Sequence, residues 1–132
     1  MIETIFPNPI PTSSSLSNKA ISDLIQEAIL AFNLTEDLEV EIMFVSKNEI
    51  AKLNKLHRKI DKPTDVLSFP QSSFKVPRKL LGSIVISDET VAEKSEDMSD
   101  VIKHGLLHLL GYDHETDENK WDAAAKKINC KL

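Results

Sequence analysis

Residues 99–110 constrain the fold more than any other stretch of the chain, because apolar residues recur there on nearly all sides of a helix. Ser99 can cap such a helix at its start. Gly111 stands where a helix would stop, since glycine adopts a left-handed C-cap conformation without strain. A helix that is apolar all round must be buried, so we predict a central helix over residues 99–110. Its apolar residues include Val101, Ile102, Leu106, Leu107, Leu109 and Leu110.

Other periodic segments predict the elements that surround this helix. Alternating apolar residues predict strands at residues 2–6, 38–46, 66–69 and 80–87. Helical spacing predicts further helices at residues 16–32, 46–60, 88–97 and 117–129. Ser46 and Glu49 form a capping box at the start of the second of these helices, and Asp88 can cap the third. Because the order lacks the regular alternation of a doubly wound sheet, we predict an α+β fold with about five helices around one mixed sheet.

The length and composition favour one globular domain over residues 1–132. No apolar run reaches the roughly 20 residues of a membrane-spanning helix, so no membrane association is expected. The N-terminus has neither a basic leader nor an apolar run, so a cytoplasmic location is expected. A net charge of −5 argues against a generally basic surface for nucleic acid, although a local basic face can still bind RNA.

Three of the four histidines lie in the predicted central helix or just after it. His104 and His108 are four residues apart and therefore face the same side of a helix. A straight continuation would carry His114 about 9 Å beyond His108 on nearly the opposite side, too far away to share an ion. A turn at Gly111 can return His114 to the other two. Three neutral imidazoles with an open fourth position are typical of a catalytic zinc site, whereas structural zinc normally has four protein ligands.

This histidine spacing is also that of the metzincin peptidases, in which a glutamate follows the first histidine and acts as the general base. The same position here holds Gly105, which has no side chain to accept a proton. Close packing against the buried helix is an equally good reason for a glycine there. The usual route to peptide hydrolysis is therefore missing, and a metallopeptidase-like hydrolase stays an alternative only if a carboxylate from elsewhere replaces the glutamate.

Three stretches together resemble the YbeY family of bacterial metal-dependent endoribonucleases. They are HGLLHLLGYDH, LNKLHRKIDKPTDVLSFP and LLGSIVIS, and the resemblance extends over about residues 38–122. It implies a four-stranded mixed sheet with the histidine helix at its centre. It also implies a zinc ion, or another divalent transition metal such as nickel, held by His104, His108 and His114. Arg58 becomes the catalytic arginine of the cleft.

The resemblance further implies the activity. Water activated by the metal would attack a phosphodiester of single-stranded RNA, in late maturation of the 3′ end of 16S ribosomal RNA and in ribosome quality control. The implied partners are ribosomal RNA and the ribosome or ribosomal proteins.

Three departures from the family pattern stand out. The family commonly has Asp where this chain has Ser83, so any hydrogen bond from that acid would be lost. His57 stands where an aromatic residue is usual, and we do not expect it to be a ligand. The segment between Ile86 and His104 is shorter than usual, which predicts a trimmed helix and a wider or differently covered cleft.

The segment from Lys47 to Lys62 is basic within an acidic chain. Six Lys or Arg residues stand there against two acidic ones, a local balance of +4. Lys52, Lys55, Lys59 and Lys62 recur at helical spacing and form a basic stripe, as phosphate binding requires. A solvated helix face would look the same. Arg58 can hold a phosphate in a bidentate grip, or it can pair with Asp61 or Asp65.

Two further points stay open. The general base is unassigned, although Asp113 and Glu115 flank His114. In a non-enzymatic alternative, the protein is a ribosome-associated metal-binding protein whose ion is structural and whose basic stripe docks on a ribosome or on a partner protein.

Overall fold

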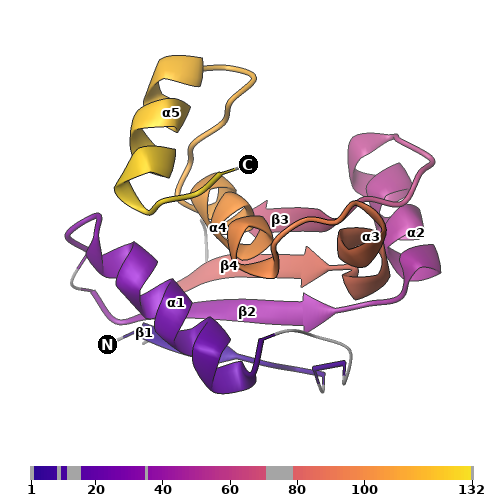
Figure 1. The fold of residues 1–132 in the computed structure, drawn as a ribbon, viewed down its shortest axis with the longest axis horizontal. Coiled ribbons are helices and arrows are strands. Elements are labelled where there is room, and N and C mark those ends of the chain that lie inside the picture. The colour runs from indigo at the N-terminus through magenta and orange to yellow at the C-terminus, as the bar shows by residue number, and fades with distance from the viewer. Residues whose placement is uncertain (1, 9, 12–15, 35, 71–78, 132) are drawn as a thin grey trace.

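A four-stranded mixed sheet organises the fold (Figure 1). The computed structural model describes residues 2–8, 10–11, 16–34, 36–70 and 79–131. The strands lie in the order β1-β2-β4-β3, with β2 parallel to both β1 and β4 and with β3 antiparallel to β4. Their bounds are β1 Ile2–Ile5, β2 Leu38–Phe44, β3 Val66–Pro70 and β4 Lys79–Ile86. The predicted mixed sheet and its four strands are confirmed.

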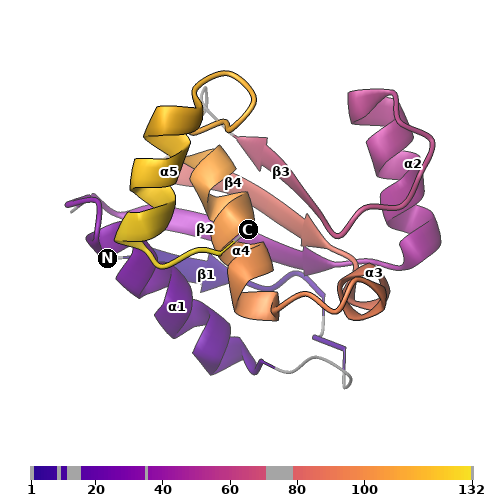
Figure 2. The same cartoon turned by 45° about the horizontal axis from the view of Figure 1, so that its top comes forward.

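Five helices in the described segments surround this sheet, which confirms the predicted α+β class. Their bounds are α1 Asn18–Leu30, α2 Lys47–Arg58, α3 Asp88–Glu93, α4 Met98–Leu109 and α5 Glu118–Lys127. Helices α1, α2 and α4 contact the sheet, whereas α5 packs on α4 and α3 packs on α2. Figure 2 shows α1 and α4 over one face of the sheet, with α5 beside α4. Helices α2 and α3 lie at the end of the sheet toward which β2 and β4 run. None of the helices in the described segments combines the length and apolarity needed to span a bilayer.

Helix α4 is central, as its sequence predicts. It contacts β3, β4, α1 and α5, and the side chains of Ile102, Leu106 and Leu107 are fully buried. These residues join the main hydrophobic core with the inward-facing residues of β2, which alternate along that strand. A smaller cluster of Ile50, Leu67 and Val85 lies under α2. The two clusters hold α2 and α4 in place beside β3.

Gly105 lets α4 lie close to the sheet. A Cβ at this position would stand 2.9 Å from Cγ2 of Ile84 and 3.2 Å from Oγ of Ser68 and Cγ2 of Val66. The hydroxyl of Ser68 also donates a hydrogen bond of 2.9 Å to the carbonyl oxygen of Gly105. Close packing therefore accounts for this glycine, with side chains of β3 and β4 as its neighbours. Position 105, which corresponds to the glutamate of the metzincins, therefore faces the sheet in this protein.

Two predicted helix caps are wrong. Asp97, and not Ser99, caps α4: its carboxylate accepts hydrogen bonds from the amides of Ser99 and Asp100 at 2.8 and 3.4 Å. Ser87, and not Asp88, caps α3. An N-cap residue must stand just outside the helix with extended backbone, and both sequence predictions place the cap inside the first turn. Adjacent residues with similar capping propensity make this error easy.

Candidate metal centre

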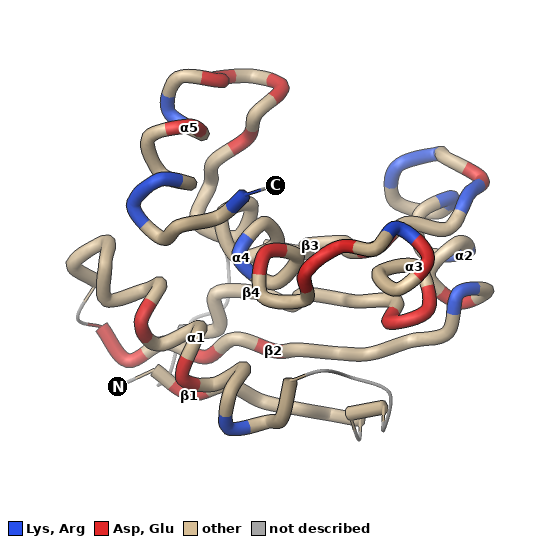
Figure 3. The backbone as a smooth tube through the Cα atoms, in the orientation of Figure 1, with Lys and Arg blue, Asp and Glu red and all other residues tan. Residues whose placement is uncertain are grey.

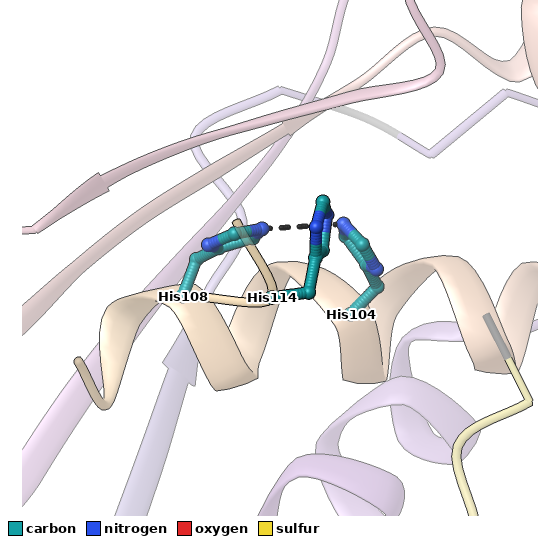
Figure 4. Close-up of side chains that lie close together, drawn as sticks. All are labelled: His104, His108 and His114. Atoms are coloured by element: carbon teal, nitrogen blue, oxygen red, sulfur yellow. Dashed lines mark hydrogen bonds between the residues drawn. The ribbon is translucent and has the colours of Figure 1, made fainter. Parts of the chain in front are cut away.

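Helix α4 presents His104 and His108 on one face, one turn apart. Figure 4 shows both imidazoles turned toward the same point, and their Nε2 atoms lie 3.2 Å apart. Both rings are half-buried between α4 and β3. The predicted spacing of four residues therefore does bring these two nitrogen atoms together.

The chain reverses at Gly111 and returns His114 to the same point. Gly111 has a φ of +96°, in the left-handed region that favours glycine. The amide of Gly111 donates to the carbonyl oxygen of His108 at 3.1 Å, and the amide of Tyr112 donates to that of Leu107 at 3.0 Å. This pair of hydrogen bonds is the Schellman motif that ends many helices. The predicted turn is present, with the backbone conformation that only glycine adopts easily.

The three imidazoles together suit a metal ion. One nitrogen atom from each of His104, His108 and His114 lies within 4.8 Å of the other two. Two ligands of one ion can be at most about 4.2 Å apart when each bond is about 2.1 Å long. The trio is thus slightly wider than a closed ligand set, and the exposed ring of His114 has the freedom to close the difference. The donor set of three imidazoles fits zinc and other divalent transition metals.

The environment of His108 favours the form of the ring that binds metal. Burial lowers the pKa of His108, and electrostatic interactions with His114 and Arg58 lower it further. The charge of Asp113 and a backbone hydrogen bond with Tyr112 act in the opposite direction, but they do not reverse the shift. A lowered pKa keeps the ring neutral, and only a neutral imidazole has a lone pair to donate.

Trp121 of α5 packs against all three histidines. Its ring centroid lies 4.9 Å from that of His104, 5.0 Å from that of His108 and 5.1 Å from that of His114. Trp121 is only 4% exposed, so it forms a rigid wall behind the three rings. Sequence reasoning missed this residue. Its helical spacing with Ala124, Ala125 and Ile128 predicts a buried face, but spacing does not say which residues that face contacts.

The histidines line a cleft of about 740 Å³ that also contains Arg58. Its walls come from the end of α2, from residues 64–70 and from the turn at 111–115. Asp61 pairs with Lys55 at 3.7 Å, and Asp65 lies 4.0 Å from Lys94. Among the residues that the structure describes, no carboxylate lies within salt-bridge distance of Arg58. The guanidinium is therefore available at the rim of the histidine cleft.

The other residues singled out in the sequence lie outside the histidine trio. His57 lines the cleft but packs edge-on against Phe69, with 4.8 Å between ring centroids. Ser83 lies on β4 and donates a hydrogen bond of 2.9 Å to Glu41 on β2. Asp113 and Glu115 both line the cleft, and the carboxylate of Asp113 accepts a hydrogen bond of 2.8 Å from the amide of Glu115. That bond gives Asp113 a place in the turn that carries His114.

Comparison with known proteins identifies the family. A family model described as "Endoribonuclease YbeY" matches residues 9–129. Proteins of that name include one from Nautilia profundicola, 44% identical over 76% of this chain and 77% of that protein. Another, from Sulfurihydrogenibium, is 34% identical over 91% of this chain and 89% of that protein. One from Aliarcobacter butzleri is 48% identical, over 62% of this chain and 64% of that protein.

A solved structure has the same fold. The solution structure of TM1509 from Thermotoga maritima matches 98% of this chain and 87% of that one, with 25% identity and a TM-score of 0.52. The likeness therefore spans the whole arrangement of sheet and helices that supports the three histidines. With the match of the family model to residues 9–129, these relatives show that the chain belongs to the YbeY endoribonuclease family.

Proposed function

We propose that this protein is a cytoplasmic, zinc-dependent endoribonuclease that cleaves single-stranded RNA, in late maturation of the 3′ end of 16S ribosomal RNA and in ribosome quality control. One observation carries the proposal: three imidazoles converge in a cleft that also holds an arginine with no carboxylate partner among the described residues. Family membership supports the choice of RNA as substrate, because the relatives are named as endoribonucleases.

His104, His108 and His114 would hold the ion. Zinc is the first choice for three imidazoles, and nickel is an alternative that the same ligands accept. When bound, such an ion supplies a Lewis acid that lowers the pKa of water and offsets negative charge on a phosphate. The chain itself favours the neutral form of His108 by burying it, and Trp121, packed behind the three rings, would orient them.

Arg58 would act on the phosphate. A guanidinium stays charged at any physiological pH and can donate two parallel hydrogen bonds to phosphate oxygens. Its place on the last turn of α2, at the rim of the histidine cleft, suits a role in positioning the scissile phosphate and in stabilising the charge that develops on it. No general base is assigned, although Asp113 and Glu115 line the same cleft.

The end of α2 would bind the RNA backbone and contact the ribosome. Lys52, Lys55, Lys59 and Lys62 are all exposed there. Figure 3 shows basic residues at this end of α2 and acidic residues along α3 and the start of α4. The charges are thus separated, although the whole chain carries a net charge of −5. A local basic surface beside the cleft is what backbone binding by a single strand requires.

Cleavage of unstructured RNA by purified protein of defined metal content tests the proposal. Metal-free protein should be inactive, and added zinc should restore cleavage. His114→Ala should abolish activity at every metal concentration. Arg58→Ala should lower the single-turnover rate by about 100-fold or more, whereas Lys19→Ala, an exposed lysine on α1, should leave it unchanged. An unchanged rate in folded, metal-loaded Arg58→Ala would remove Arg58 from the mechanism.

The same assay separates the two alternative functions. A ribosome-associated protein with a structural ion would bind RNA without cleaving it and would unfold when the ion is chelated. A metallopeptidase would cleave unfolded protein substrates in a zinc-dependent way. In the described part of the chain, the sheet packs against Gly105, and so no carboxylate can act from that position.

A further inference from the structure

A second hollow of about 560 Å³ adjoins the metal cleft on the other side of the turn after α4. Gly111 and Tyr112 line both of them. The far side of the second hollow comes from Phe32, just after α1, and from α5. Gly111 is exposed, and a Cβ built on it would meet no atom within 4 Å. No side chain at position 111 therefore separates the cleft from the second hollow.

Two aromatic rings lie in the second hollow. The ring centroids of Phe32 and Tyr112 are 5.7 Å apart, with 35° between the ring planes. Both residues are half-buried, so each holds a fixed place while part of its ring faces the hollow. Aromatic rings fixed in this way can stack on any base of a single strand, because every base has a flat face.

Two lysines of α5 also line the second hollow. Lys120 and Lys127 are seven residues apart and therefore lie on the same face of the helix, and both are exposed. Figure 3 shows basic residues on α5, at the opposite end of the sheet from α2. Nζ of Lys127 lies 5.3 Å from the centroid of Phe32. Lys120 lies 3.9 Å from Asp117 in an exposed pair, which is weak enough for a phosphate to replace it.

We propose that the second hollow binds the continuation of a single-stranded RNA whose scissile phosphate lies in the metal cleft. The RNA strand crosses the exposed turn at Gly111, and one of its bases stacks on Phe32 and Tyr112. Lys120 and Lys127 contact the phosphates that follow. Interleaved aromatic and basic side chains of this kind are how proteins bind single strands without sequence preference. This inference rests on the proposed function, and it adds a second basic contact surface on the side of the turn away from α2.

Binding of labelled RNA to Lys120→Gln/Lys127→Gln tests the inference. Fluorescence anisotropy of the metal-loaded protein with nuclease-resistant phosphorothioate RNA measures binding without cleavage, for a strand of about 12 nucleotides and for a trinucleotide. For single strands, each lost phosphate contact lowers the slope of log affinity against log salt by about 0.7. The double variant should therefore lose a slope of about 1.4 on the long strand and bind the trinucleotide as the unaltered protein does.

Lys126→Gln is the matched control, since Lys126 is an exposed lysine of the same helix that does not line the second hollow. If the double variant binds the long strand with the same salt slope as this control, the inference is wrong. An equal loss for both RNAs would also overturn it, because the effect would then be one of general charge. Failure of the unaltered protein to cleave RNA would instead sink the proposed function itself. If the protein cleaves RNA but these variants do not differ, only the proposed RNA binding in the second hollow is disproved.

Discussion

Gly105 shows how one residue can exclude one chemistry. It takes the position of the metzincin glutamate, and the structure explains the glycine by contact with Ile84, Ser68 and Val66. A side chain there would push α4 off β3 and β4. The replacement of glutamate by glycine is therefore a packing requirement as well as the loss of a base.

Gly105→Ala should destabilise the protein despite the better helix propensity of alanine. The gain in propensity is about 1 kcal/mol in a helix interior. A Cβ that stands 2.9 Å from Ile84 must shift α4 or the strand, and overpacking of a well-packed core costs about 1–3 kcal/mol. Chemical denaturation should give a net loss on the order of 1 kcal/mol. A higher free energy of unfolding for Gly105→Ala would contradict the close packing described here.

Trp121 should tune the affinity for metal, because it is the common neighbour of the three imidazoles. Changes to residues that orient metal ligands typically cost 10- to 100-fold in affinity, so Trp121→Ala should weaken zinc binding by about that factor. Trp121→Phe keeps an aromatic ring and should lose less. Competition with a chelator measures the affinity, and circular dichroism checks the fold of each variant. Wild-type affinity in folded Trp121→Ala would show that the contact does not orient the rings.

At the scale of elements, the link between α3 and α4 is attached to the cleft wall by two carboxyl groups. Burial, a hydrogen bond with Asp65 and the charge of Asp65 raise the pKa of Glu96 to about 7. Burial opposes ionisation of Asp65, but its hydrogen bonds with Glu96, Thr64 and Val66 and the charge of Lys94 together lower its pKa. These shifts favour a protonated Glu96 beside an ionised Asp65 at the start of β3.

This pair predicts a pH dependence of stability. Between the ordinary value of 4.5 and about 7, the folded protein keeps a proton on Glu96 that the unfolded chain has released, so stability falls as pH rises through this range. Glu96→Gln keeps a hydrogen-bond donor and removes the titration. The variant should match the wild type near pH 5 and exceed it near pH 8 by an amount on the order of 1 kcal/mol, since the group is partly exposed. Equal pH profiles of thermal unfolding for both proteins would disprove the link, and Asp122→Asn, at an exposed carboxylate of α5, is the control.

At the scale of the whole molecule, the candidate metal site is formed by α4, by the turn after it and by α5, which follow one another in the chain. The turn after α4 brings His114 to α4, and α5 brings Trp121 behind the rings. The apolar core joins Ile102, Leu106 and Leu107 to residues of α1, β2 and β4, and the histidines contact it through Trp121. The fold should therefore persist without an ion and become more stable when one binds.

Zinc should stabilise the protein by mass action. At a zinc concentration about 100 times the Kd, the free energy of unfolding should rise by about 2.7 kcal/mol. A chelator should return the melting temperature to that of the metal-free protein without unfolding it. His108→Ala should show no rise. Loss of structure on chelation would favour a structural ion and would argue against the catalytic proposal.

The histidine trio was predictable because its signals are local. The spacing of His104 and His108 follows from helix geometry, and Gly111 marks a helix end by its own conformational freedom. The family could be predicted for the same reason, because three contiguous sequence stretches carry the resemblance. The match of the family model confirms it. The caps of α3 and α4 were predicted wrongly, because neighbouring polar residues compete for one position.

The sequence by itself determined the class of the fold, the central helix and the return of His114, all through periodicity and backbone preferences within a few residues. Only the tertiary structure decided that Trp121 lies behind the imidazoles, that Gly105 faces β3 and β4, and that Arg58 lies in the histidine cleft without a carboxylate partner among the described residues. It also decided that Phe32 and Tyr112 meet beside the lysines of α5. Such contacts join different elements, and they depend on how whole elements pack against each other, which periodicity within one element does not encode.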